Sequence, residues 1–379
     1  MKLTLTTTAL ALILGLVGPA LADIKIGASV SETGSASFLG DPEAKTLKML
    51  VEEINAAGGV NGEPLQLILY DDGGDPNKAR TFATRLVEDD EVVAVIGGTT
   101  TGTSMAMIPV FEDAEVPFIS LAGAIEIIDP VRPFTFKTPH TDRMACAKIF
   151  EDMKKRQIQK IGMISGSDGF GASMRKQCLA IIGDYGIEVL ADETYGPSDA
   201  DMTPQLTNIK AKPGLQAVLN PGFGQGPAIV TRNYAQLAVG LPLYQSHGVA
   251  SDGFISLAGS DAAEGVRLPG TALLVADLLP ESDPQRAVVV AYKTAYEKAT
   301  GKPVSTFGGY AHDALRILVD AMKRTGSSEP SAIRDAIEGT TGLVGTTGTV
   351  TMTPTDHLGL DLTAFRMLAI EKGGWKIVE

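Results

Sequence analysis

The chain has 379 residues, of which 45 are acidic and 32 basic, and its formal net charge at pH 7 is −13. Nucleic acids and anionic membranes are bound through basic faces, so this charge argues against either as a partner. A single hydrophobic core stops growing near ~250–300 residues, and the length therefore predicts two domains.

The first 22 residues have the pattern of a secretory signal peptide. Lys2 gives a charged start, residues 10–17 are apolar, and Ala20-Leu21-Ala22 has the small-x-small form of a cleavage site. This apolar run is too short to span a membrane. No cysteine that could carry a lipid anchor lies in or just after it. We therefore expect export to a bacterial periplasm, cleavage after Ala22, and no direct membrane insertion.

From Asp23 onward, short apolar runs alternate with amphipathic helical patterns. The expected strands of this first series are residues 24–30, 65–70, 92–96 and 117–120. Asp41-Pro42 and Asp75-Pro76 each supply an N-cap residue followed by a proline at the first helical position. Both dipeptides therefore predict helix starts.

A second series of the same kind follows Thr138-Pro139 and ends in long helical patterns and a β-hairpin. Its expected strands are residues 161–165, 187–191, 217–220 and 243–245. Such alternation is typical of parallel sheets with right-handed crossovers. We expect an α/β fold of two doubly wound parallel-sheet domains joined by a multi-strand hinge. The expected N-terminal lobe is residues 23–140 plus 272–340, and the C-terminal lobe is residues 141–271 plus 341–379.

Three consecutive threonines, Thr99, Thr100 and Thr101, lie between an expected strand and the helix that follows it. Hydroxyls, free backbone N–H groups and the positive end of a helix dipole together favour an anion. The loop has no lysine and lacks the phosphate-binding GxxxxGK[ST] pattern, so a small carboxylate is a better candidate than a nucleotide. The alternative is that these threonines merely cap their own helix.

Other chemical signals point away from catalysis. The four histidines show no metal-ligand spacing, and no G-x-S-x-G nucleophile elbow is present. The glycines of residues 166–171 have the wrong order for a dinucleotide site. We therefore expect a protein that is not an enzyme and has no metal and no cofactor. Cys146 and Cys178 both fall on expected helices, and the sequence leaves their pairing open.

Taken together, several segments resemble the periplasmic leucine/isoleucine/valine-binding protein family, the type I solute-binding components of ABC importers. The resemblance covers essentially the whole mature chain. It is carried by IKIGASVSETGSASFLG, EEINAAGGVNGEPLQLILYDDGGDPNKA, VIGGTTTGTS, VPFISLAGA and SDGFGAS. It implies two lobes that close over a ligand, which the protein then delivers to a membrane permease. We expect it to act as a monomer.

The resemblance also assigns site positions. In this family two loops of the first lobe hold the ligand's carboxylate, and aromatic residues of the second lobe close over it. Phe170 and Phe223 stand where tyrosine is usual, and Ala124 replaces the usual threonine. The expected ligand-binding residues are Phe38, Thr99, Thr100, Thr101, Ala122, Gly123, Ala124, Phe170, Phe223 and His247.

The most informative departure is His247, which matches the position of the glutamate that accepts an amino acid's α-ammonium. An ammonium left unpaired in a desolvated cleft costs several kcal/mol, whereas an imidazole can donate to an acid. We therefore expect an aromatic carboxylate such as a hydroxycinnamate, a benzoate or an aryl-2-oxo acid. The alternatives are a binder of branched-chain amino acids, amides or urea in the same family, or the ligand-sensing domain of a receptor.

Overall fold

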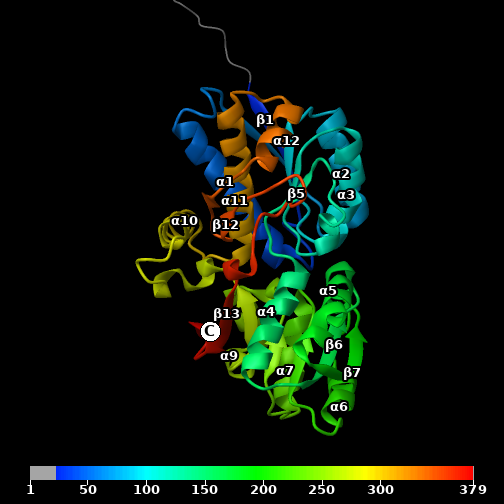
Figure 1. Cartoon of the computed structure of the whole chain (residues 1–379). Helices are drawn as coiled ribbons and strands as arrows, with labels where there is room; N and C mark the ends of the chain where they lie inside the picture. The colour runs from blue at the N-terminus through cyan, green and yellow to red at the C-terminus, as the bar shows by residue number, and fades with distance from the viewer. Residues whose placement is uncertain (1–22, 379) are drawn as a thin grey trace, which may run out of the picture.

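The computed structural model describes residues 23–378, which form two α/β lobes stacked one above the other (Figure 1). The expected signal peptide, residues 1–22, lies outside the described residues. No helix within residues 23–378 combines the length and the apolar character that a membrane span requires.

The first lobe is built on a five-stranded parallel sheet with the strand order β2-β1-β3-β4-β5. Its strands are β1 (Ile24–Val30), β2 (Leu65–Asp71), β3 (Ala94–Gly97), β4 (Phe118–Ser120) and β5 (Thr135–Lys137). Its helices are α1 (Ser37–Ala56), α2 (Pro76–Glu88), α3 (Thr101–Asp113), α11 (Thr306–Thr325) and α12 (Pro330–Glu338). Because helices cover both faces, strands β1, β3, β4 and β5 are almost entirely buried.

The second lobe has a seven-stranded sheet with the order β14-β13-β10-β9-β8-β6-β7. Its parallel strands are β6 (Lys160–Gly166), β7 (Glu188–Tyr195), β8 (Ala217–Asn220), β9 (Leu243–Gln245) and β10 (Arg267–Gly270). The hairpin β13 (Arg366–Glu371) and β14 (Gly374–Ile377) pairs antiparallel at one edge, as predicted. Its helices are α4 (Asp142–Lys155), α5 (Gly169–Ile181), α6 (Thr203–Lys210), α7 (Gln225–Gln236), α8 (Asp252–Ala258) and α9 (Ser260–Ala263).

Of the two helix starts predicted from Asp-Pro dipeptides, one is confirmed and the other is wrong. Asp75 caps α2 by accepting hydrogen bonds from the backbone N–H groups of Asn77 and Lys78, as predicted. Helix α1, by contrast, begins at Ser37, so the predicted start at Asp41 is wrong. A Cβ at Gly40 would lie 2.1 Å from the carbonyl oxygen of Ser31. Close packing on the loop after β1 therefore extends the helix upstream, with no capping side chain to signal it.

The chain crosses between the lobes three times: between β5 and α4, between β10 and the 3₁₀ segment η4 (Ala272–Leu278), and just before β13. Helix α10 (Arg286–Thr300) packs on η4 beside the first lobe (Figure 1). Val350, Met352 and Leu360 belong to the core of the first lobe. The expected return to the second lobe near residue 341 is therefore too early, because Phe365 is the next residue to join a core of that lobe.

Cys146 on α4 and Cys178 on α5 form a disulfide, which settles the question that the sequence left open. Both side chains are fully buried in a core of the second lobe. The disulfide ties together two helices that cover the same sheet.

Reducing this disulfide should lower the free energy of unfolding by about 3–4 kcal/mol, the loss that the chain-entropy model gives for two cysteines 32 residues apart. Urea unfolding with and without a reductant measures the difference. The Cys146→Ala/Cys178→Ala double variant is the control and should not respond to the reductant. Equal midpoints for the oxidised and the reduced protein would contradict the expectation.

Candidate functional site

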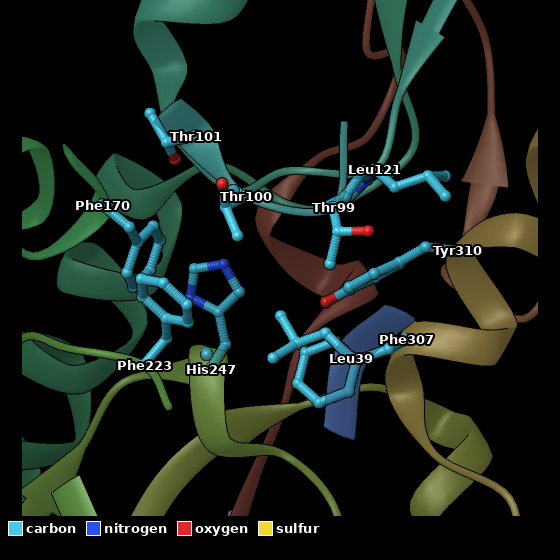
Figure 2. A pocket seen from close by; sticks show the side chains of 13 residues that line it. Leu39, Thr99, Thr100, Thr101, Leu121, Phe170, Phe223, His247, Phe307 and Tyr310 are labelled. Carbon is cyan, nitrogen blue, oxygen red and sulfur yellow. The ribbon is translucent and has the colours of Figure 1, made fainter. Parts of the chain in front are cut away.

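A cavity of about 360 Å³ lies between the lobes, at the carboxyl ends of both parallel sheets (Figure 2). Ligands of open α/β sheets bind at this end of the strands. Seven of the ten predicted residues line the cavity: Thr99, Thr100, Thr101, Gly123, Phe170, Phe223 and His247. Six lining residues were not predicted: Leu39, Leu121, Pro139, Gly248, Phe307 and Tyr310.

The three threonines follow a sharp turn at the end of β3, where Gly98 has a φ of 66°. The hydroxyl of Thr99 donates to Glu43 Oε2 at 2.5 Å and accepts from the backbone N–H of Ser31 at 2.9 Å. The hydroxyl of Thr100 caps α3 by accepting from the backbone N–H of Thr103 at 3.1 Å. Two of the three hydroxyls therefore serve the fold of their own lobe.

Thr101 differs from its neighbours. It is the first residue of α3 and is 5% exposed, yet its hydroxyl has no hydrogen-bond partner among residues 23–378. A buried polar group left unpaired costs about 1–3 kcal/mol. Because the side chain borders the cavity, this hydroxyl is free to bind a ligand. The loop is thus part helix cap and part candidate anion site.

The second loop brings Gly123 to the cavity but not its two alanine neighbours. The N–H of Ala122 donates to Ser120 Oγ at 3.2 Å, and the carbonyl of Ala124 accepts from Lys137 Nζ at 3.2 Å. A Cβ at Gly123 would lie 2.7 Å from the Phe170 ring and 3.0 Å from His247 Nε2. The second lobe therefore packs directly against this loop, and any side chain at position 123 would obstruct that approach.

Phe170, Phe223 and His247 form the side of the cavity that belongs to the second lobe (Figure 2). Asp168 caps α5 and so fixes Phe170 at the start of that helix. The ring of Phe170 lies edge-on to Phe223 and to His247, with centroid distances of 6.1 Å and 5.4 Å. These contacts make an aromatic corner that faces the first lobe.

His247 is 3% exposed, and its Nδ1 atom has no partner in the part of the chain that the structure describes. Burial, with a smaller contribution from the Lys137 ammonium, lowers the pKa of His247 to about 3. The imidazole is therefore neutral at neutral pH, so one ring nitrogen donates and the other accepts.

The opposite side of the cavity comes from α11, which supplies Phe307 and Tyr310 (Figure 2). The predicted ligand-binding residue Phe38 does not line the cavity, and its ring packs edge-on against Phe307, which does, at 5.8 Å. The Tyr310 hydroxyl is buried and has no partner within residues 23–378.

A family model described as periplasmic binding protein matches residues 23–373, nearly all of the described chain. The chain belongs to the periplasmic binding protein family. This membership gives the protein a role in binding a solute in the periplasm. Its two-lobed α/β fold with parallel sheets is the fold of the structures it matches.

Three known proteins illustrate how similar this chain is to others in sequence and fold. The chain is 26% identical over 340 residues to the "Leucine-, isoleucine-, valine-, threonine-, and alanine-binding protein" of Pseudomonas aeruginosa, covering 89% of this chain and 86% of that one. An extracellular ligand-binding receptor from Rhodopseudomonas palustris matches with a TM-score of 0.88 and 29% identity, covering 94% of this chain and 100% of that one. A Streptococcus pneumoniae branched-chain amino acid transporter substrate-binding protein, in complex with isoleucine, shares the fold at 23% identity and a TM-score of 0.84, covering 94% and 99%.

Replacing Thr101 and Thr100 separately should distinguish the hydroxyl that is free for a ligand from the hydroxyl that caps α3. In the ligand-free periplasmic binding protein, Thr101→Val should leave the free energy of unfolding unchanged or higher, because the lost hydroxyl has no partner among the described residues. Thr100→Val should lower it by about 1 kcal/mol, because the α3 cap is lost. Urea unfolding measures both variants. A loss of ~1 kcal/mol or more in Thr101→Val would show that its hydroxyl is already paired.

Acid should destabilise the protein in part through His247. Below a pH of about 6.5 the unfolded chain takes up a proton on this side chain, whereas the folded protein does so only near pH 3. As the pH is lowered through this window, His247 alone should reduce the free energy of unfolding by up to about 1.4 kcal/mol per pH unit. In His247→Gln the loss of stability with falling pH should be shallower. Part of the loss should remain, because burial also lowers the pKa of His140. Chemical unfolding at several pH values measures the slope, and identical slopes would contradict the expectation.

Proposed function

We propose that this periplasmic binding protein captures a small aromatic carboxylate by cleft closure and delivers it to the permease of an ABC importer. The observation that carries the proposal is the charge of the cavity lining. Among the described lining residues none bears a carboxylate, and His247 stands where the family's ammonium-binding glutamate is expected. An α-ammonium would therefore be buried without a counter-charge, at a cost of several kcal/mol.

A carboxylate has suitable partners at one end of the cavity. The N-terminus of α3 presents the positive end of its dipole, and the Thr101 hydroxyl beside it is unpaired within residues 23–378. The neutral imidazole of His247 can donate to a carboxylate from Nδ1, which has no partner within residues 23–378, in the tautomer that carries the proton there. Buried Lys137, whose charge acts on His247, adds positive potential without reaching the cavity lining.

The rest of the lining suits a flat apolar ring. Phe170, Phe223 and Phe307 supply aromatic faces and edges, and Leu39 and Leu121 supply aliphatic contacts. Aromatic pairs contribute about 0.5–1.5 kcal/mol beyond the area they bury.

A branched-chain amino acid is the second candidate, because the Pseudomonas aeruginosa relative is named for such ligands. Glu43 is the residue that favours it: the carboxyl is buried behind Thr99, and its Oε1 has no partner in the described chain. Burial, with a smaller contribution from the Asp72 carboxyl, raises the pKa of Glu43 well above its usual value. An acid that lies outside the cavity lining, and whose charged form burial disfavours, is a poor counter-charge, so we favour the aromatic carboxylate.

Within this proposal the chain performs no chemistry on its ligand. Residues 1–22 direct export and are removed after Ala22, and the mature protein acts as a monomer. Binding favours the closed arrangement because a ligand then touches both lobes, and the permease distinguishes the closed form from the open one.

Calorimetric titration tests the ligand class directly. The protein is unfolded, freed of co-purified ligand and refolded, then titrated with 4-hydroxycinnamate, 4-hydroxybenzoate and leucine. At least one aromatic acid should bind with micromolar or tighter affinity, and leucine should not, because its ammonium would be unpaired. Binding of leucine alone would overturn the proposed ligand class and leave the solute-binding role intact.

Two variants at one position control that titration. His247→Gln keeps a neutral hydrogen-bonding side chain and should retain the aromatic acid within about tenfold in affinity, the worth of one hydrogen bond. His247→Glu places a second carboxylate in the cavity and should weaken the acid far more, because like charges repel. Equal affinities for the acid in the two variants would place His247 outside the binding site.

A further inference from the structure

Tyr310 has a feature that the solute-binding role leaves unexplained. Its ring is 2% exposed, and its hydroxyl finds no partner among residues 23–378. Other buried tyrosines differ, because the hydroxyls of Tyr234 and Tyr244 donate to Leu241 and Asp152, and that of Tyr292 pairs with Thr46. Because burying an unpaired hydroxyl is unfavourable, this one must gain its partner from outside the described chain.

The hydroxyl is aimed into the cavity from the side opposite to Thr101. Figure 2 shows the Tyr310 oxygen pointing toward the centre, with Thr101 at the far side and His247 beside Phe170 and Phe223. The backbone carbonyl of Tyr310 accepts a hydrogen bond from the Thr138 hydroxyl at 2.9 Å, which fixes this turn of α11 to the first crossing segment. The cavity therefore has two polar ends, Thr101 with His247 at one and Tyr310 at the other.

The Tyr310 end suits a neutral polar group. Leu39 and Phe307 line the cavity beside it, and neither can balance a charge. Burial raises the pKa of the Glu43 carboxyl behind this end, which disfavours its charged form. Burial, with a smaller contribution from Glu43, also raises the pKa of Tyr310, so its hydroxyl stays protonated. A charged substituent would be desolvated here without a partner, whereas a hydroxyl would form one hydrogen bond.

We infer that Tyr310 determines specificity by hydrogen bonding a hydroxyl at the end of the ligand remote from its carboxylate, so that the ligand class is a ring-hydroxylated aromatic acid. This inference rests on the proposed function. The carboxylate lies at the Thr101 end, the ring lies between the apolar walls, and a hydroxyl para to the acid-bearing carbon reaches Tyr310. An acid without that hydroxyl fills the same space but leaves the Tyr310 hydroxyl unpaired.

Two matched ligand pairs test the inference at pH 7: 4-hydroxycinnamate against cinnamate, and 4-hydroxybenzoate against benzoate. In each pair that binds, the wild-type protein should prefer the hydroxylated acid by about tenfold, the worth of one hydrogen bond. Tyr310→Phe removes only the oxygen and should reduce the preference to less than about twofold, while affinity for the unsubstituted acid stays the same or rises. The matched control is Tyr234→Phe, whose lost hydrogen bond to Leu241 lies within the second lobe, and it should keep the wild-type preference.

Two results would overturn the inference while the proposed function stands: equal affinity of the wild-type protein for both members of each pair that binds, or a preference that persists in Tyr310→Phe. A stability measurement on Tyr310→Phe shows that the variant is folded. If none of the four acids binds the wild-type protein and leucine does, the proposed function fails and the inference fails with it.

Discussion

A polar atom removed from water needs a hydrogen-bond partner, and the two lobes meet around atoms for which the described chain supplies none. Within the first lobe the hydroxyls of Thr99 and Thr100 are paired, one with Glu43 and Ser31 and the other with Thr103. The Thr101 and Tyr310 hydroxyls and Nδ1 of His247 have no such partner within residues 23–378. Each unpaired group costs about 1–3 kcal/mol in the absence of a ligand. Under the proposed function, a ligand that satisfies these groups removes that penalty and so favours the arrangement in which it touches both lobes.

The contact between the lobes consists of small residues and aromatic rings. Gly123 of the first lobe lies against Phe170 and His247 of the second, so the boundary contact and the cavity wall share residues. Phe365, at the third crossing, stacks on His140 at 3.9 Å and lies 5.5 Å from His247. The exposed Lys176 ammonium of the second lobe pairs with the Glu126 carboxylate of the first at 2.7 Å. Because exposed ion pairs contribute little, the proposed closure depends mainly on the filling of the cavity.

The sequence predicted the fold better than the site, for physical reasons. Apolar periodicity depends on burial, so strands such as β8 and β9 have the predicted bounds. Residues 37–40 join α1 through packing on a loop, which no local pattern signals. Similarly, the sequence predicts one role for all three threonines of the loop. The difference between the unpaired Thr101 hydroxyl and its paired neighbours arises from tertiary contacts, which the local sequence does not show. Phe307 and Tyr310 lie some 200 residues beyond that loop, and the packing of α11 against α1 directs them to the cavity. Their one signal was a pair of aromatic residues three apart in the first turns of an otherwise ordinary amphipathic helix.

The charges around the cavity bear on the proposed ligand, because they determine whether a ligand's ammonium group would find a counter-charge. Burial lowers the pKa of Lys137 to about 7, and Asp142, whose pKa burial raises, is the nearby acid that acts on it. On the other side, burial raises the pKa of Glu43 and so disfavours its charged form. An anion in the cavity would stabilise the protonated form of Lys137, whereas an ammonium would destabilise it. No carboxylate among the described lining residues could balance that ammonium. The local electrostatics thus favour a carboxylate independently of the shape of the cavity.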